Sequence, residues 1–114
     1  MAEILHITSA ASWAESQKTG EHRDPSLDTE GFIHCSSAEQ VLGPANALFK
    51  GQSGLILLRI DTEKLDQPLV LEDTYGHGAF PHIYGALNLA AVIGTVHFSA
   101  NADGSFSLPD ELAR

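Results

Sequence analysis

Six histidines occur among the 114 residues, and three of them lie in apolar segments that predict strands or turns. These three are His6, His34 and His82. A buried histidine needs a polar partner for its second ring nitrogen, so it is seldom placed among isoleucines for bulk alone. Three such positions in separate segments favour one shared pocket, with imidazoles suited to general acid–base chemistry near neutral pH. The alternative is that each ring is a structural group, hydrogen-bonded within the core.

Alternation along an extended chain predicts which neighbours share a face with these histidines. In the segment GFIHCS, the side chains of Phe32, His34 and Ser36 point the same way. In PHIYG, the side chains of His82 and Tyr84 share a face. An aromatic ring beside an imidazole forms a narrow pocket with an apolar wall and one polar group, the imidazole nitrogen. Such a pocket suits a small heteroaromatic ligand.

Other chemistries are indicated less strongly. Three histidines could supply a zinc site, but no two of them have the short spacing of a metal motif, so the sequence predicts no metal ligands. Cys35 lies in an apolar segment without a basic neighbour, which is typical of an inert buried thiol. Arg23, in the loop before GFIH, is the first candidate among the cations for contacting a phosphate. Glu30 and Glu72 are candidates for the border of a pocket, but they are expected mainly to keep the surface soluble.

The charge balance excludes several classes of partner. Fifteen acidic residues stand against six lysines and arginines, which gives a formal net charge of −9. With so few cations for phosphate groups, we expect no nucleic-acid partner and no attraction to an anionic membrane surface. No apolar run approaches the ~20 residues that cross a bilayer. The single cysteine excludes an internal disulfide framework, so we expect a cytoplasmic protein without a disulfide-linked partner.

Hydrophobic periodicity predicts the strands that position these residues. Strands are expected at residues 3–8, 31–35, 55–60, 69–72 and 91–98, followed by a turn at 101–104 and a return strand at 105–107. The strand at 55–60 is the most apolar and is expected to be central and buried on both faces.

Capping residues predict two helices. The first is expected at 10–19, with Thr8 or Ser9 as its cap, Gly20 as its end, and Ala10, Trp13, Ala14 and Gln17 on one stripe. The second is expected to open with a capping box at Ser37 and Gln40 and to reach Phe49, with Pro44 kinking or dividing it. Its core-facing side chains are expected to be Val41, Leu42, Ala45, Leu48 and Phe49.

The order of these elements predicts the fold class. Segments 21–30 and 75–81 are expected to be loops, because they are polar or rich in glycine and proline. Both helices fall in the first half and most strands follow the second helix, which favours an α+β fold over an alternating parallel sheet. The length fits one domain covering residues 1–114.

Three motifs carry a resemblance to a known family. LHIT, EGFIHCSSAEQV and FPHIYGALNLAAV together resemble the DUF952 family of small bacterial proteins, whose biochemical role is not established, over about residues 3–109. The resemblance implies an ADP-ribosyltransferase-like fold, with split antiparallel β-sheets and about two to three helices. It also implies that a nicotinamide nucleotide such as NAD lies in the cleft between the sheet halves.

The resemblance also implies roles for particular residues. His6 matches the position that contacts the adenosine ribose, and His34 with Ser36 matches the wall of the nicotinamide pocket. His82 and Tyr84 lie near the third motif, where many transferases carry a catalytic glutamate that FPHIYG lacks. The candidate catalytic residues are therefore His34, His82 and Tyr84, and the candidate cofactor-binding residues are His6, Arg23, Phe32 and Ser36.

Three functional hypotheses follow. The first is an enzyme with ADP-ribosyltransferase-like chemistry on a nicotinamide or related nucleotide. The second is a noncatalytic module of the same fold that binds a small metabolite, which the missing glutamate favours. The third is that the histidines are purely structural. The branch of the superfamily that removes a 2′-phosphate from RNA is excluded, because six cations cannot provide a basic cleft for RNA.

Overall fold

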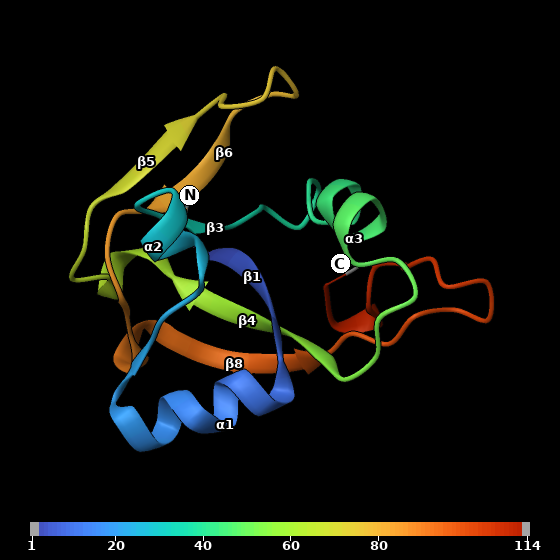
Figure 1. Ribbon diagram of the computed structural model, residues 1–114, viewed down its shortest axis with the longest axis horizontal. Helices are drawn as coiled ribbons and strands as arrows, with labels where there is room; N and C mark the ends of the chain where they lie inside the picture. Colours follow the sequence, from blue (N-terminus) through green and yellow to red (C-terminus); the bar gives the residue numbers. More distant parts are fainter. Residues whose placement is uncertain (1–2, 113–114) are drawn as a thin grey trace.

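The computed structural model describes residues 3–112, and in this range the strands form three antiparallel sheets. The first sheet has the order β1-β4-β8, with β1 at Glu3–Ser9, β4 at Leu55–Asp61 and β8 at Val92–His97. The second has the order β3-β6-β5, with β3 at Ile33–His34, β6 at Phe80–Ile83 and β5 at Leu69–Glu72. A third, two-stranded sheet pairs β2 (Glu21–His22) with β7 (Leu87–Asn88). Figure 1 shows the β5–β6 pair above the β1-β4-β8 sheet.

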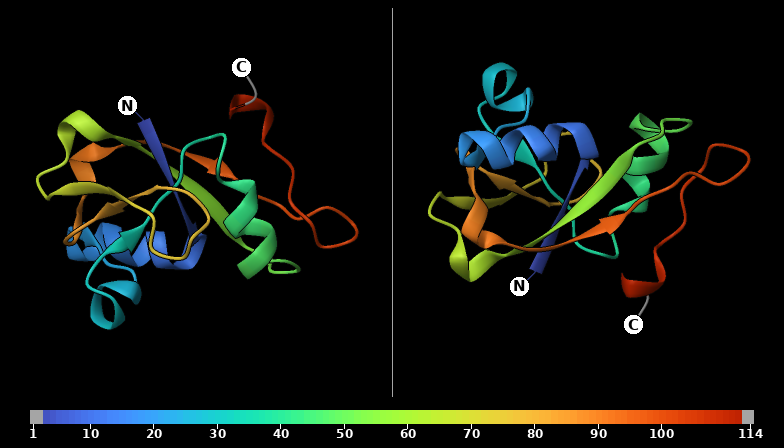
Figure 2. Two further views of the ribbon diagram at one scale, coloured as in Figure 1. Left: turned by 90° about the horizontal axis from the view of Figure 1, so that it is seen from above. Right: turned by 90° about the horizontal axis from the view of Figure 1, so that it is seen from below.

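The central strand β4 separates two hydrophobic clusters, as its apolar sequence predicts. On one face, Ile56, Leu58 and Ile60 pack with Ile33 and Ile83 of the second sheet. On the other face, Leu55 and Leu57 pack with the α3 region and with the chain after β8; the members there include Val41, Ala45, Phe98, Phe106 and Leu112. Figures 1 and 2 show this C-terminal segment on the same side of the molecule as α3.

Helix α1 (Ala10–Thr19) has the predicted bounds. The Ser9 side chain accepts a hydrogen bond from the Ser12 amide, and Gly20 ends the helix in a left-handed conformation with φ of 94°. The predicted stripe of this helix is buried only in part: Trp13 packs on the core, but Ala10, Ala14 and Gln17 are exposed. The buried residue of α1 is Ser16, which faces His22 and so makes this side of the helix partly polar.

Helix α3 (Leu42–Leu48) is shorter than predicted. The Ser37 amide donates to the Gln40 side chain, but residues 37–40 form a turn and the helix begins after Val41. Pro44 is therefore in the first helical turn, where an amide has no intrahelical partner to lose, and it does not divide the helix. Leu48, a predicted core residue, is 71% exposed.

Three loop and strand predictions also need correction. The predicted loop 21–30 contains β2 and one helical turn, α2 (Ser26–Thr29). The predicted strand 31–35 pairs at only two residues, and β6 begins inside the predicted loop, at Phe80. No strand forms at 105–107, although the turn before it is present. Two-residue strands carry no detectable periodicity, so tertiary pairing alone defines them.

The remaining elements are single turns of 3₁₀ helix, at η1 (Thr62–Lys64), η2 (Leu89–Ala91) and η3 (Asp110–Leu112). With three α-helices in the first half and antiparallel sheets, the described residues form one α+β domain, as predicted. In this part of the chain, no helix has the length and apolar character needed to span a membrane.

Candidate functional site

A cleft of about 940 Å³ opens among β1, the second sheet, α3 and the loop 73–79. The three histidines that are predicted to share a pocket, His6, His34 and His82, all line it, together with Ser36. The strand pairing explains this convergence. His34 lies opposite His82 in the β3–β6 ladder, and Ser36 is joined to Leu5 of β1 by a pair of backbone hydrogen bonds.

His34 forms the outer wall of the cleft with a carboxylate partner. Its ring is 39% exposed, and Nε2 lies 2.6 Å from Oε2 of Glu30. The Tyr75 hydroxyl donates a hydrogen bond to the other oxygen of the same carboxylate. These hydrogen bonds, from Tyr75 first and then His34, lower the pKa of Glu30, and the same contact raises the pKa of the Tyr75 hydroxyl. The loop before β6 thereby reaches across to the β3 segment.

His82 is the buried counterpart of His34, with 2% exposure. Its Nδ1 lies 2.8 Å from Oε1 of Glu72, and the Tyr84 hydroxyl donates to the same oxygen at 2.6 Å. The hydrogen bonds of Tyr84 and then His82 lower the pKa of Glu72. Phe32 stacks on the His82 ring, with centroids 4.0 Å apart and planes within 14°. The imidazole is therefore fixed by an aromatic face and an anionic edge.

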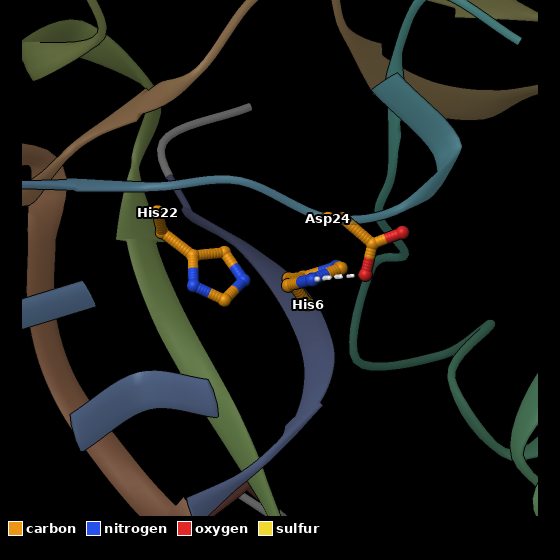
Figure 3. A group of neighbouring side chains, drawn as sticks. All are labelled: His6, His22 and Asp24. Atoms are coloured by element: carbon orange, nitrogen blue, oxygen red, sulfur yellow. Dashed lines mark ion pairs between the residues drawn. The ribbon is translucent and has the colours of Figure 1, made fainter. Parts of the chain in front are cut away.

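His6 belongs to a third group, which extends inward from the cleft. Its Nδ1 donates to the backbone oxygen of His34 at 2.7 Å, and its Nε2 lies 3.5 Å from Oδ1 of Asp24. The His22 ring approaches His6 with centroids 5.3 Å apart. Figure 3 shows the His6 ring between the side chains of His22 and Asp24.

Burial and mutual charge set the protonation states in this third group. Burial, and then the charge of His6, lowers the pKa of His22 to about 4, while Asp24 acts in the opposite direction. Burial alone would raise the pKa of Asp24, but its contacts with His6 and Ser26 outweigh that effect and hold the pKa below its usual range. Near neutral pH, His22 is therefore neutral and Asp24 is ionised.

The structure places the other predicted site residues at or beyond the edges of the cleft. Phe32 stacks on His82, and Tyr84 contacts the Phe32 ring and the Glu72 carboxylate; neither is among the described residues that line the cleft. Arg23 lies outside the cleft, in contact with Glu21 and Asp28. The prediction that places Arg23 beside a ligand phosphate in this cleft therefore finds no geometric support.

The sequence does not show which carboxylates partner the histidines, although Glu30 and Glu72, the candidates for a pocket border, both line the cleft. Surface solubility is the favoured prediction for Glu30 and Glu72, and Asp24 and His22 lie in a segment interpreted as a loop. The four-residue spacing of Glu30 and His34 is a weak local signal. Glu72 is brought to His82 by the β5–β6 pairing, which no local pattern reveals.

The cleft has an acidic polar lining. Asp24, Glu30 and Glu72 contribute to it, and no lysine or arginine is among its described lining residues. Cys35 is a buried free cysteine, and burial raises the pKa of its thiol, as expected for an inert group.

The fold and site thus define an α+β domain with a cleft lined by histidine–carboxylate pairs. The chain belongs to the family described as "Protein of unknown function (DUF952)", whose model matches residues 7–95. It is similar to the crystal structure of protein CC0527 from Caulobacter crescentus, with 34% identity, a TM-score of 0.88, and coverage of 98% of this chain and 99% of that chain. The solution NMR structure of CC0527 is 34% identical, with a TM-score of 0.85 over 99% and 98% of the two chains. No curated protein matches the chain.

Proposed function

We propose that the cleft binds a small heteroaromatic metabolite, a nicotinamide nucleotide or a related nucleotide or nucleoside, and acts on it by general acid–base chemistry. The observation that carries this proposal is the arrangement of His34 and His82. The two rings lie 5.2 Å apart at the wall of one cleft, and each is held by a different carboxylate. A carboxylate partner fixes the ring orientation and the tautomer of an imidazole.

The two hydrogen bonds leave a different nitrogen available on each ring. Because an ionised carboxylate only accepts, His82 donates from Nδ1 to Glu72, and its Nε2 keeps a lone pair in the neutral ring. His34 donates from Nε2 to Glu30, which leaves Nδ1 as its basic nitrogen. One imidazole can therefore act as a general base and accept a proton from a bound molecule. The other, once protonated, can act as a general acid and donate a proton to that molecule.

The arrangement of the sheets supports the ADP-ribosyltransferase-like interpretation. Two separate three-stranded antiparallel sheets and three helices are compatible with the split-sheet fold that the family resemblance implies. The motif FPHIYG lacks a glutamate, but Glu72 of the neighbouring strand brings a carboxylate to His82 and Tyr84 of that motif. In this proposal Glu72 acts through His82, as a positioning residue.

The charge of the cleft narrows the ligand class. Its described lining residues include three carboxylates and no lysine or arginine, so a pyrophosphate inside the cleft would be repelled. This favours a neutral or cationic ring system, such as nicotinamide or its riboside, over the whole of NAD.

The same acidity supports the proposal that the protein has no nucleic-acid partner. Buried Cys35 supports the absence of a disulfide-linked partner, in accord with a cytoplasmic location.

Titration with nicotinamide, nicotinamide riboside, NAD and ADP-ribose tests the proposal. A ligand present at about 100 times its Kd adds about 2.7 kcal/mol of stability, which a thermal-shift measurement detects in a small domain. In NMR spectra, the imidazole signals of His34 and His82 should move with ligand. The signals of exposed His97, which does not line the cleft, serve as the internal control. If none of the four compounds stabilises the protein or moves the two signals, the proposal is rejected.

The burial of His82 favours a second candidate, a noncatalytic module that binds the same class of metabolite. With 2% exposure and a stacked Phe32, this ring has little freedom to exchange protons with a ligand. Long incubation of the protein with a bound compound, followed by chromatography of the small molecule, distinguishes the two. A chemically unchanged ligand selects the binding module, whereas a product that disappears in His34→Ala selects the enzyme.

A further inference from the structure

His6 on β1, His22 on β2 and Asp24 in the following loop bring three metal-ligand side chains to one place. One donor atom from each residue lies within 4.8 Å of the other two, and Nε2 of His6 is already 3.5 Å from Oδ1 of Asp24. We propose that these residues bind a divalent transition-metal ion at the inner end of the cleft. The proposal is independent of the nucleotide proposal, since it needs no other ligand.

Two buried nitrogens without a hydrogen bond point to an ion. Nε2 of His6 and Nε2 of His22 are both inaccessible to solvent, and neither has a hydrogen-bond partner within the described range of the chain. The rings themselves are 4% and 0% exposed. Nε2 of His6 has only the 3.5 Å ion-pair contact with Asp24, and Nε2 of His22 has no hydrogen-bond partner among the described residues. Leaving a buried polar atom without a hydrogen bond is unfavourable, so these two nitrogens indicate a place where a ligand binds.

The hydrogen bonds on the far side of each ring fix the tautomers. A carbonyl oxygen only accepts, so His6 carries its proton on Nδ1, donated to the backbone oxygen of His34. The Ser16 hydroxyl donates its only proton to the carbonyl of Ser12, and so it accepts from Nδ1 of His22. In the neutral rings, both Nε2 atoms therefore hold lone pairs. This pattern, with one nitrogen tied to an oxygen and the other free, is typical of metal-binding histidines.

The Asp24 carboxylate likewise has one oxygen held by a hydrogen bond and the other directed at the cluster. Oδ2 of Asp24 accepts from the backbone amide of Ser26 at 3.1 Å, which leaves Oδ1 directed at His6. A doubly protonated His6 paired with Asp24 would satisfy these two residues but not Nε2 of His22. An ion between the three donors satisfies all of them at once.

The donor set indicates the class of ion. Two imidazole nitrogens and one carboxylate oxygen suit Zn²⁺ and its first-row neighbours, whereas Mg²⁺ and Ca²⁺ prefer oxygen ligands. Donor atoms at about 2.0–2.2 Å from a zinc ion lie about as far apart as Nε2 of His6 and Oδ1 of Asp24 do here. The donor atom of His22 lies within 4.8 Å of both and would move toward them when an ion binds. Because His6 and Asp24 also line the cleft, the remaining coordination positions would face it.

Metal titration of the full chain, without nucleotide, tests the site. Zinc affinity is measured by competition with a chromophoric chelator after the protein has been stripped with EDTA, and Co²⁺ absorption reports the coordination geometry. We expect one zinc per chain in the wild type and an affinity at least about 100-fold weaker in His22→Gln and Asp24→Asn. The exposed residue His97 provides the control His97→Gln, which should bind like the wild type.

Further variants distinguish this site from binding elsewhere in the cleft and from loss of the fold. Asp24→Asn preserves the size of a side chain that is 26% exposed, so this variant should fold even if His22→Gln does not. His34→Gln tests whether the ion instead binds between the paired histidines of the cleft wall, and it should keep the wild-type affinity. Wild-type protein that binds no zinc, Asp24→Asn that binds as tightly as wild type, or loss of binding in His34→Gln would each overturn the proposal.

Discussion

His34 and His82 lie directly opposite each other on the antiparallel strands β3 and β6, with ring centroids 5.2 Å apart and planes at 77°. Although they form a pair, their environments differ. His34 is 39% exposed and bound to Glu30 at the rim, whereas His82 is 2% exposed, bound to Glu72 and stacked on Phe32. The same residue type is therefore accessible to a ligand on one strand and part of the packed interior on the other.

This asymmetry predicts unequal losses of stability. His34→Ala removes a partly exposed ion pair and should cost at most about 1 kcal/mol in the free energy of unfolding. His82→Ala removes a buried, stacked ring and leaves a cavity, so it should cost roughly 2–4 kcal/mol. Urea denaturation measures both, with His97→Ala as the exposed control. Equal large losses would instead assign both rings to the structural hypothesis.

The strands and helices could be predicted from the sequence where an apolar run or a pair of capping residues marks them. The burial of strand β4 follows from its run of apolar residues, and the ends of α1 follow from Ser9 and Gly20. Both signals lie within a few neighbouring residues and can therefore be read from the sequence. A shared pocket for three histidines was predictable because each of them lies in an apolar segment. The structure brings His6, His34 and His82 to the same cleft.

The pairing of His82 with Glu72 and of His6 with His22 could not be predicted from the sequence. Glu72 meets His82 through the β5–β6 register, and His22 reaches His6 through a two-residue strand without periodicity. Both contacts depend on tertiary pairing, and the charges look like surface residues in the sequence. The position of Arg23 also depends on tertiary structure. The sequence predicts it near a ligand phosphate, but in the structure it lies outside the cleft.

Glu72 should make the protein sensitive to acid. Its pKa is lowered from the usual value of 4.5 by hydrogen bonds from Tyr84 and His82, so the folded state favours its ionised form. This stabilisation is present above the unfolded-state pKa and is lost as the pH falls through the lower folded-state pKa. In Glu72→Gln, the Tm deficit relative to wild type should therefore shrink from pH 7 to pH 3. Glu15→Gln, on the exposed side of α1, should show no such trend; a constant Tm deficit for Glu72→Gln would contradict the assignment.

Cys35 should report opening of the core. It is 3% exposed, and burial raises the pKa of its thiol, so little thiolate is available to react. At pH 8, an aromatic disulfide reagent should leave the folded protein unmodified and should label one thiol per chain in urea. As the control, Ala102→Cys places a second thiol in an exposed turn, where it should react at once. Cys35 belongs to the hydrophobic cluster that Ile56, Leu58 and Ile60 of β4 form with the second sheet, so its rapid labelling in the native protein would show that this cluster opens readily.

Ser16 should position His22 for metal binding. Its hydroxyl accepts from Nδ1 of His22 at 2.7 Å, and both side chains are buried. Ser16→Ala leaves that N–H unpaired, which should cost about 1–3 kcal/mol of stability, measured by urea denaturation. Loss of such an outer partner should also weaken zinc binding by about 10-fold or more.

Two matched variants separate these effects. Ser12→Ala keeps the backbone carbonyl to which Ser16 donates and should retain wild-type zinc affinity. Ser16→Thr restores a hydroxyl and should recover much of the affinity even if the added methyl group lowers the Tm. A merely structural role would change stability alone. Ser16→Ala that is destabilised but binds zinc like the wild type would therefore show that this hydrogen bond supports the fold without orienting a metal ligand.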